Sequence, residues 1–169
     1  MRLLFLDVDY VLNKKNTNIF TPDGDCFVED EKVELLKELI DKTNAKVVLS
    51  STWREGWEDD KNNLDTKNRR DFILLKNKFL EYGIELYDYT SLPVINDRSF
   101  RILEYLNKYK EDISSILILD DIYSMEVLNK YFLKTSILEG LTSKHVKKGI
   151  NILLKDDFQE WSKKKEIFK

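Results

Sequence analysis

The sequence predicts an α/β fold built on a parallel sheet of about five strands, with helices on both faces. Short apolar runs of strand length alternate along the chain with segments whose apolar residues recur at helical spacing. Two of these runs, at residues 3–6 and 116–119, are apolar throughout, which is typical of strands buried on both faces of a parallel sheet. This alternation indicates β-α-β units with right-handed crossovers.

The predicted elements extend over all 169 residues, and we expect one domain, 1–169. Strands are predicted at 3–6, 46–50, 84–87, 115–119 and 131–135. Apolar stripes that begin near residues 33, 72, 102 and 146 predict helices. The polar, turn-rich residues 13–28 are expected to form a flap loop over the end of the first strand, and 157–169 a C-terminal helix packed on the body.

Composition narrows the classes of function. Lys and Arg number 28 against 31 Asp and Glu, a net charge of -3, so bulk binding of nucleic acid is not expected. Cys26 is the single cysteine, which excludes an internal disulfide and favours a reducing, cytoplasmic location. No apolar run approaches the length of a membrane span, and no signal-peptide pattern precedes the first strand. We therefore expect a cytoplasmic protein with no membrane contact; its oligomeric state is not indicated.

Paired acids follow both fully apolar strands. Asp7 and Asp9 end the first strand, and Asp120 and Asp121 end the fourth. Asp is common in turns, so either pair alone could simply close a strand. If the two strands are parallel neighbours, however, four carboxylates converge at one edge, where burying them requires a cation. An all-oxygen ligand set favours Mg²⁺ over Ca²⁺.

Groups suited to an anion lie after the second strand and at the start of a later helix. Ser50 and Ser51, with Arg54, could hold phosphate oxygens, although a cluster of hydroxyls also favours a helix N-cap. Arg98 stands at a helix start, where the helix dipole disfavours a cation, so it is a candidate anion ligand. Arg101, one turn further on, is the alternative; either could be an ordinary surface charge.

Residues 54–70 form the longest stretch without a clean period and are expected to be a solvated loop, which could serve as a lid or specificity element. Trp57, with Lys67, Arg69 and Arg70, would suit a nucleotide or a nucleic-acid end through stacking and charge. Trp53 and Trp57 could equally pack on one helix face.

Taken in order, these motifs resemble those of the haloacid dehalogenase (HAD) superfamily. The segments 6–13, 47–54 and 119–121, together with Arg98, are similar to the small, nearly capless HAD domain associated with RNA-repair proteins. They are also similar in layout to the phosphatase domain of polynucleotide kinase-phosphatases. The resemblance implies a Rossmann-like sheet of order 3-2-1-4-5 with a minimal cap or none.

The resemblance also implies a Mg²⁺-dependent phosphatase that acts through a phospho-aspartate. Asp7 would be the nucleophile and Asp9 the general acid and base, with its backbone carbonyl reaching the metal. Asp120 and Asp121 would complete the metal site with Asp7. Ser50, helped by Ser51, and Arg98 would hold the phosphate, with Arg98 standing where the family more often has Lys.

One residue departs from the family pattern. Tyr10 replaces a small residue, commonly Gly, and could narrow the pocket, stack on a substrate base or alter the turn.

The sequence leaves three functions open: a phosphatase for nucleic-acid ends or nucleotides, a phosphatase for another small phosphoester, and a non-catalytic binding or regulatory module. The intact acids favour the first two.

Overall fold

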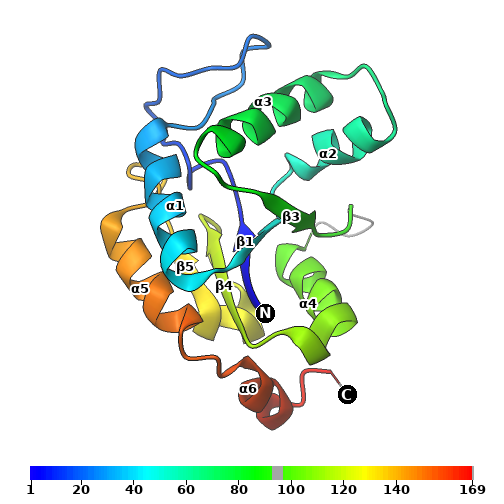
Figure 1. Cartoon of the computed structure of the whole chain (residues 1–169), viewed down its shortest axis with the longest axis vertical. Helices are drawn as coiled ribbons and strands as arrows, with labels where there is room; N and C mark the ends of the chain where they lie inside the picture. Colours follow the sequence, from blue (N-terminus) through cyan, green and yellow to red (C-terminus); the bar gives the residue numbers. More distant parts are fainter. Residues whose placement is uncertain (93–96, 169) are drawn as a thin grey trace.

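The computed structural model describes residues 1–92 and 97–168. Its centre is a five-stranded parallel sheet in the order β3-β2-β1-β4-β5 (Figure 1). The strands are β1 (Arg2–Leu6), β2 (Lys46–Leu49), β3 (Leu86–Tyr89), β4 (Ser115–Asp120) and β5 (Phe132–Lys134). The predicted fold class and strand order are confirmed. The order makes β1 the central strand, with β2 on one side and β4 on the other.

The side chains of β1 alternate between two cores. Leu4 and Leu6 face the core that also holds α1 (Asp30–Thr43), α3 (Lys67–Glu81) and α5 (Ser143–Leu153). Leu3 and Phe5 face the core formed with α4 (Arg98–Tyr109) and α6 (Phe158–Lys165). Figure 1 shows α1 and α5 on one side of the sheet and α4 on the other. Because both faces of β1 are covered, its continuous apolar run is accounted for.

The segment 54–70 differs from the expected loop. Residues Arg54–Lys61 form a helix, α2, and α3 already begins at Lys67, so only 62–66 connect the two. Gly56 explains the close approach of these helices, because a Cβ at this position would overlap the backbone oxygen of Asn68. The prediction of a loop was therefore wrong for most of the segment, although a role in specificity stays a prediction.

Two other elements differ from their predicted bounds by two residues or more. The third strand is two residues later than predicted, at Leu86–Tyr89, and the C-terminal helix is shorter, at Phe158–Lys165. Residue 169 lies outside the described residues. Apolar residues of the C-terminal segment, Phe158, Trp161 and Phe168, pack against the second core, as its predicted docking requires.

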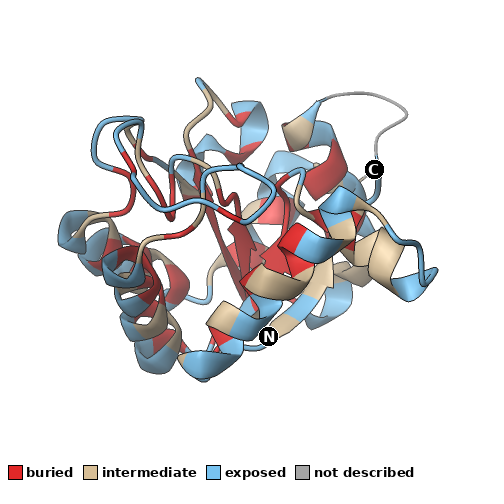
Figure 2. Ribbon diagram, turned by 90° about the horizontal axis from the view of Figure 1, so that it is seen from above, coloured by how far each residue is buried: buried red, intermediate tan, exposed pale blue. Residues whose placement is uncertain are grey.

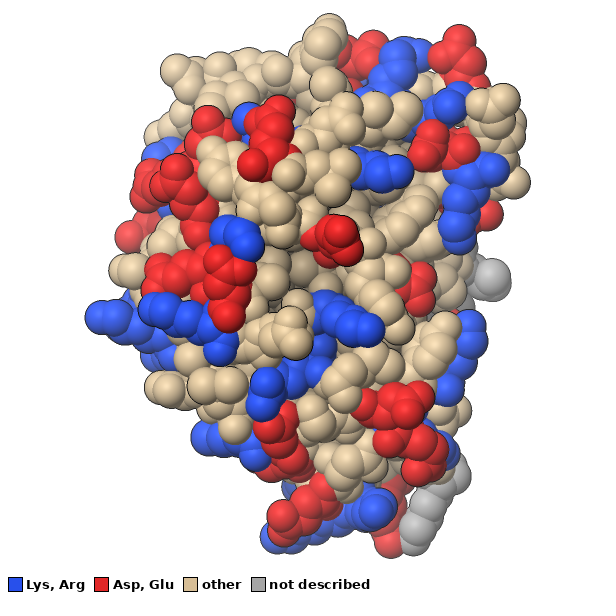
Figure 3. Space-filling model, viewed as in Figure 1, with Lys and Arg blue, Asp and Glu red and all other residues tan. Residues whose placement is uncertain are grey.

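The buried residues gather in the strands and on the inward faces of the helices (Figure 2). On the face shown in Figure 3, acidic and basic side chains are interspersed. None of the helices in the described ranges combines the length and apolar character that crossing a membrane requires.

Candidate active site

The predicted acids meet because their strands are neighbours. Leu6 of β1 pairs with Leu119 of β4, so the next residues, Asp7 and Asp120, emerge side by side at the carboxyl edge of the sheet. The Asp7 N–H donates to the Leu119 carbonyl at 3.0 Å and continues the ladder. On the other side, the Ser50 N–H donates to the Leu6 carbonyl at 2.9 Å. Asp7 is thus flanked by Ser50 on one side and by Asp120 on the other.

Asp7, Asp120 and Asp121 form a compact carboxylate cluster. One oxygen from each lies within 4.8 Å of the others, and Asp7 and Asp120 are only 5% and 0% exposed. Three hard oxygen ligands at this spacing, two of them desolvated, fit Mg²⁺. The Asp9 carboxylate is not in this group; a contact of its backbone carbonyl with the metal stays a prediction.

Arg98 supplies a positive charge to this cluster. It is the first residue of α4, and its Nη1 lies 2.9 Å from Asp7 Oδ1 and 2.5 Å from Asp120 Oδ2. Arg101 is buried one turn further along α4, and within the described part of the chain its Nε and Nη1 have no hydrogen-bond partner. Of the two candidates, Arg98 is the one that contacts the predicted nucleophile.

The electrostatics follow from burial among like charges. Burial raises the pKa of Asp7 to about 8; Arg98 opposes this rise, and the neighbouring Asp120, Asp9 and Asp121 add to it. Burial and Asp120 also raise the pKa of Asp121. Burial lowers the pKa of Arg98, but Asp7 and Asp120 outweigh that effect and the net shift is upward. Carboxyl groups with raised pKa values mark a site that favours a further cation.

The residues after β2 divide into two roles. Ser50 Oγ is buried and has no hydrogen-bond partner among the described residues, which leaves its hydroxyl available to a ligand. Ser51 Oγ accepts from the Trp53 N–H at 3.1 Å and so closes the local turn. Arg54 is fully buried and donates to three carbonyls, those of Ser50, Ser51 and Ser91, which anchors the chain after β2. No observation tests the predicted phosphate contact of Arg54.

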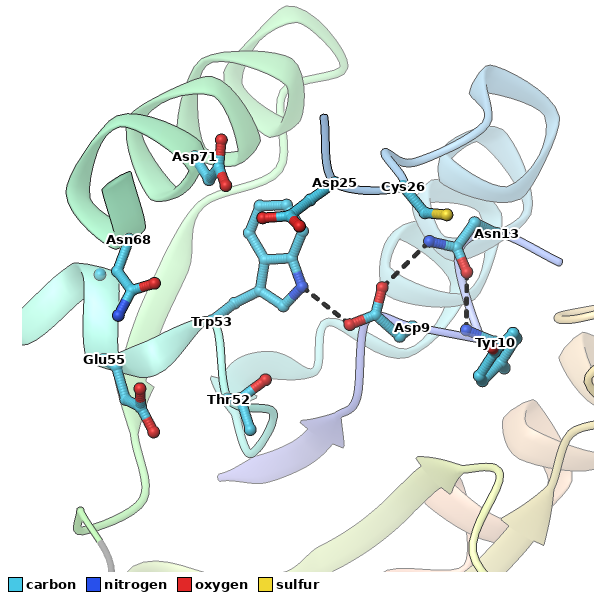
Figure 4. Close-up of a pocket in the computed structure, with 11 residues that line it drawn as sticks. Asp9, Tyr10, Asn13, Asp25, Cys26, Thr52, Trp53, Glu55, Asn68 and Asp71 are labelled. Carbon is cyan, nitrogen blue, oxygen red and sulfur yellow. Dashed lines mark hydrogen bonds between the residues drawn. The ribbon is translucent and has the colours of Figure 1, made fainter. Parts of the chain in front are cut away.

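Asp9 is held by two donors that the sequence analysis did not identify. Trp53 Nε1 donates to Asp9 Oδ2 at 3.1 Å, and Asn13 Nδ2 donates to Asp9 Oδ1 at 3.2 Å (Figure 4). Asn13 Oδ1 in turn accepts from the Tyr10 N–H at 2.7 Å. Both oxygens of the proposed general acid are therefore fixed. Trp53 and Asn13 lie within the segments 47–54 and 6–13 that carry the family resemblance, but no spacing rule predicts their hydrogen bonds to Asp9.

Tyr10 adopts a backbone conformation that favours glycine. Its φ is +60°, in the left-handed region where a residue with a Cβ is strained by roughly 1–2 kcal/mol. Hydrogen bonds at both ends of the residue support this conformation, since its carbonyl accepts from Thr135 Oγ1 at 2.8 Å. The residue is 37% exposed and lines a cavity next to Asp9.

This cavity of about 480 Å³ opens beside Asp9. Figure 4 shows its walls: Asp25 and Cys26 come from the predicted flap loop, Glu55 from α2, and Asn68 and Asp71 from α3. The flap segment 13–28 thus borders the site, as its position in the chain suggested.

Trp57 and the basic residues near it are not among the described residues that line this cavity. The Trp57 ring stacks on Phe72 with centroids 5.3 Å apart and contacts Tyr89 at 4.9 Å, so it packs between α2, α3 and β3. Lys67, Arg69 and Arg70 form ion pairs with acids of the flap loop and of segment 60–65. These contacts account for the four residues without a ligand, and their predicted role in substrate binding stays untested.

A scan against family models matches residues 3–146 to the HAD domain in Swiss Army Knife RNA repair proteins. The chain belongs to this HAD-domain family. Comparisons with curated proteins and with solved structures returned no significant match. HAD domains are generally hydrolases with phosphatase-type activity, and the carboxylate cluster of this HAD domain could hold the metal ion that they typically use.

Proposed function

We propose that this HAD domain is a Mg²⁺-dependent phosphomonoesterase that acts through a phospho-aspartate on nucleic-acid ends or nucleotides. The observation that carries the proposal is the convergence of Asp7, Arg98 and Asp120 at the carboxyl edge of the sheet. The neighbouring strand adds Ser50, whose hydroxyl has no hydrogen-bond partner within the described part of the chain. The family description, which names RNA repair, supports the substrate class. A cytoplasmic location would suit such a substrate.

In the first step, an Asp7 carboxylate oxygen forms a bond to phosphorus while the bond to the leaving oxygen breaks. Asp9 donates its proton to that oxygen, so that a neutral alcohol departs. Trp53 and Asn13 hold the Asp9 carboxyl group in place during this transfer. In the second step, Asp9 accepts a proton from water, which attacks phosphorus and releases inorganic phosphate from Asp7.

The reaction brings an anionic nucleophile to an anionic phosphate, so positive charge is essential. Arg98 supplies part of it, because its guanidinium already contacts the Asp7 oxygen. Mg²⁺ bound by Asp7, Asp120 and Asp121 would supply the rest by neutralising the phosphoryl oxygens. Ser50, together with Ser51, would donate hydrogen bonds to the phosphate.

The test is hydrolysis of an aryl phosphate with and without Mg²⁺, comparing the parent with Asp7→Asn. We expect a magnesium-dependent rate that falls by at least about a thousandfold in the variant, since no nucleophile remains. Asp41→Asn is the matched control, because this side chain lies on α1 and is 57% exposed. A rate that survives in Asp7→Asn would refute the nucleophile assignment.

End-phosphorylated oligonucleotides, mononucleotides and other small phosphoesters then separate the substrate classes. Absence of hydrolysis with all of these substrates would reject the phosphatase proposal and favour a binding module.

A further inference from the structure

The cavity beside Asp9 is separate from the carboxylate cluster. Its described lining residues include Asp9 but none of Asp7, Arg98, Asp120 and Ser50. Asp9 therefore stands at the boundary between the phosphate side of the site and the cavity. Its carboxyl group is held at this boundary by Trp53, which also lines the cavity (Figure 4).

This arrangement indicates which part of a substrate enters the cavity. A general acid must lie within hydrogen-bond distance of the oxygen that it protonates. If Asp9 protonates the leaving oxygen, the alcohol attached to that oxygen extends to the far side of Asp9 from Asp7. The cavity is lined by Asp9 and not by Asp7, so it can receive this group, and its volume of about 480 Å³ is in the usual range for small-molecule sites.

The charged side chains in the described lining of the cavity are all acidic. Its described lining carries the carboxylates of Asp9, Asp25, Glu55 and Asp71 and includes neither Lys nor Arg. Lys67 pairs with Asp25, which offsets one of these charges. A leaving group with its own phosphate would still bring a negative charge close to the remaining carboxylates in a partly desolvated space.

Asp71 also indicates a ligand that donates hydrogen bonds. The residue is 5% exposed and lines the cavity, yet its buried Oδ1 has no hydrogen-bond partner among the described residues. A buried acceptor without a donor is costly, and a ligand hydroxyl would satisfy it. Burial, followed by a side-chain hydrogen bond with Asp25, raises the pKa of Asp71, while a hydrogen bond with Thr21 opposes the rise.

We propose that the cavity holds an uncharged, hydroxyl-rich leaving group of nucleoside size. The preferred substrates are then monophosphates whose alcohol carries no second phosphate, so a mononucleotide is favoured over an oligonucleotide end. The rings of Trp53 and Tyr10 offer apolar surface to a base, while the Asp71 and Glu55 carboxylates accept from sugar hydroxyls. This inference rests on the proposed phosphatase function and narrows its substrate class.

The test uses pairs of nucleotides that differ by one charge. The first pair is a nucleoside 5′-monophosphate and the same compound with a 3′ methyl phosphodiester; the second is the 3′-monophosphate with and without a 5′ methyl phosphodiester. A monoesterase cannot cleave the added diester, which imitates the next unit of a chain. In both pairs we expect kcat/KM to be at least tenfold lower for the diester compound. Equal or faster hydrolysis of the diester compounds would overturn the inference.

Two variants test whether the cavity causes the difference in kcat/KM within each pair of nucleotides. Glu55→Gln and Asp71→Asn remove one negative charge each with little change of shape, and each should reduce the difference within a pair to less than about threefold. Asp41→Asn on α1 should leave the difference unchanged. Thermal unfolding monitors whether the variants are folded. Glu55 is only half-buried, so Glu55→Gln keeps the test valid if Asp71→Asn does not fold. An undiminished difference in a folded Glu55→Gln variant would also overturn the inference.

The outcome is distinguishable from failure of the proposed function. If an aryl phosphate is hydrolysed in an Asp7-dependent manner but the nucleotide pairs show no difference, only the leaving-group inference fails. If none of the phosphate esters is hydrolysed, the phosphatase proposal itself fails.

Discussion

Binding of Mg²⁺ to this domain should release a proton at neutral pH. In the metal-free protein the pKa of Asp7 is about 8, because the carboxyl group is buried and faces Asp120, and Arg98 offsets only part of this effect. At pH 7 a group with this pKa is mostly protonated. A metal ligand must be ionised, so binding displaces most of one proton from Asp7.

The pH dependence follows with a defined sign. Below pH 8, each fall of one pH unit should weaken the apparent affinity for Mg²⁺ about tenfold, because protons compete with the metal for Asp7. Above about pH 9 the affinity should be constant. Titration calorimetry in two buffers of different ionisation enthalpy measures the number of protons released. Asp7→Asn provides the control, since it has no proton to lose at this position.

Two results would refute this reasoning. The first is a binding enthalpy that does not depend on the buffer at pH 7. The second is an affinity that is constant from pH 6 to pH 9. Either would mean that Asp7 is already ionised in the metal-free protein, so that Arg98 outweighs burial and the neighbouring acids.

Three further variants test other parts of the structure. Trp53→Phe removes the donor to Asp9 but keeps a ring; we expect kcat/KM, which reports only the first step, to fall about tenfold for alkyl phosphates, while 4-nitrophenyl phosphate, whose leaving group needs no protonation, changes less than about threefold. Equal losses with both substrates would contradict a positioning role. Arg98→Met removes the charge beside the nucleophile and should lower kcat at saturating Mg²⁺ at least about a hundredfold; a loss below tenfold would rule out this role. Gly56→Ala should destabilise the protein by about 1–3 kcal/mol in urea denaturation, although Ala is the better helix former, because the new Cβ meets the Asn68 backbone. A variant as stable as the parent would show that α2 and α3 can separate freely.

The sequence was most informative where a pattern has one physical solution. Apolar runs that end in paired acids predicted two buried strands, and the register of β1 with β4 brings Asp7 beside Asp120. The charge at the start of α4 predicted the importance of Arg98, which contacts both acids. These features depend on burial and charge, whose patterns can be recognised in short segments of the sequence.

The sequence was less informative where tertiary contacts decide the structure. The polar residues of α2 show no apolar stripe, and the helix depends on the close packing that Gly56 allows against α3. The donors that hold Asp9 come from Trp53, 44 positions away, and from Asn13 in a turn. Neither contact follows from local spacing, because the folded path of the chain creates both.

The ion pairs of Arg98 have a consequence for how the protein is made. A cluster of buried carboxylates without countercharge would oppose folding until a metal ion arrived, and small zinc domains show such dependence on their metal. Here α4 brings a cation of its own to two of the three carboxylates. We therefore expect the newly synthesised chain to fold without divalent ions. Under the proposed function, a shortage of magnesium would then leave a folded but inactive protein that regains activity when the ion returns.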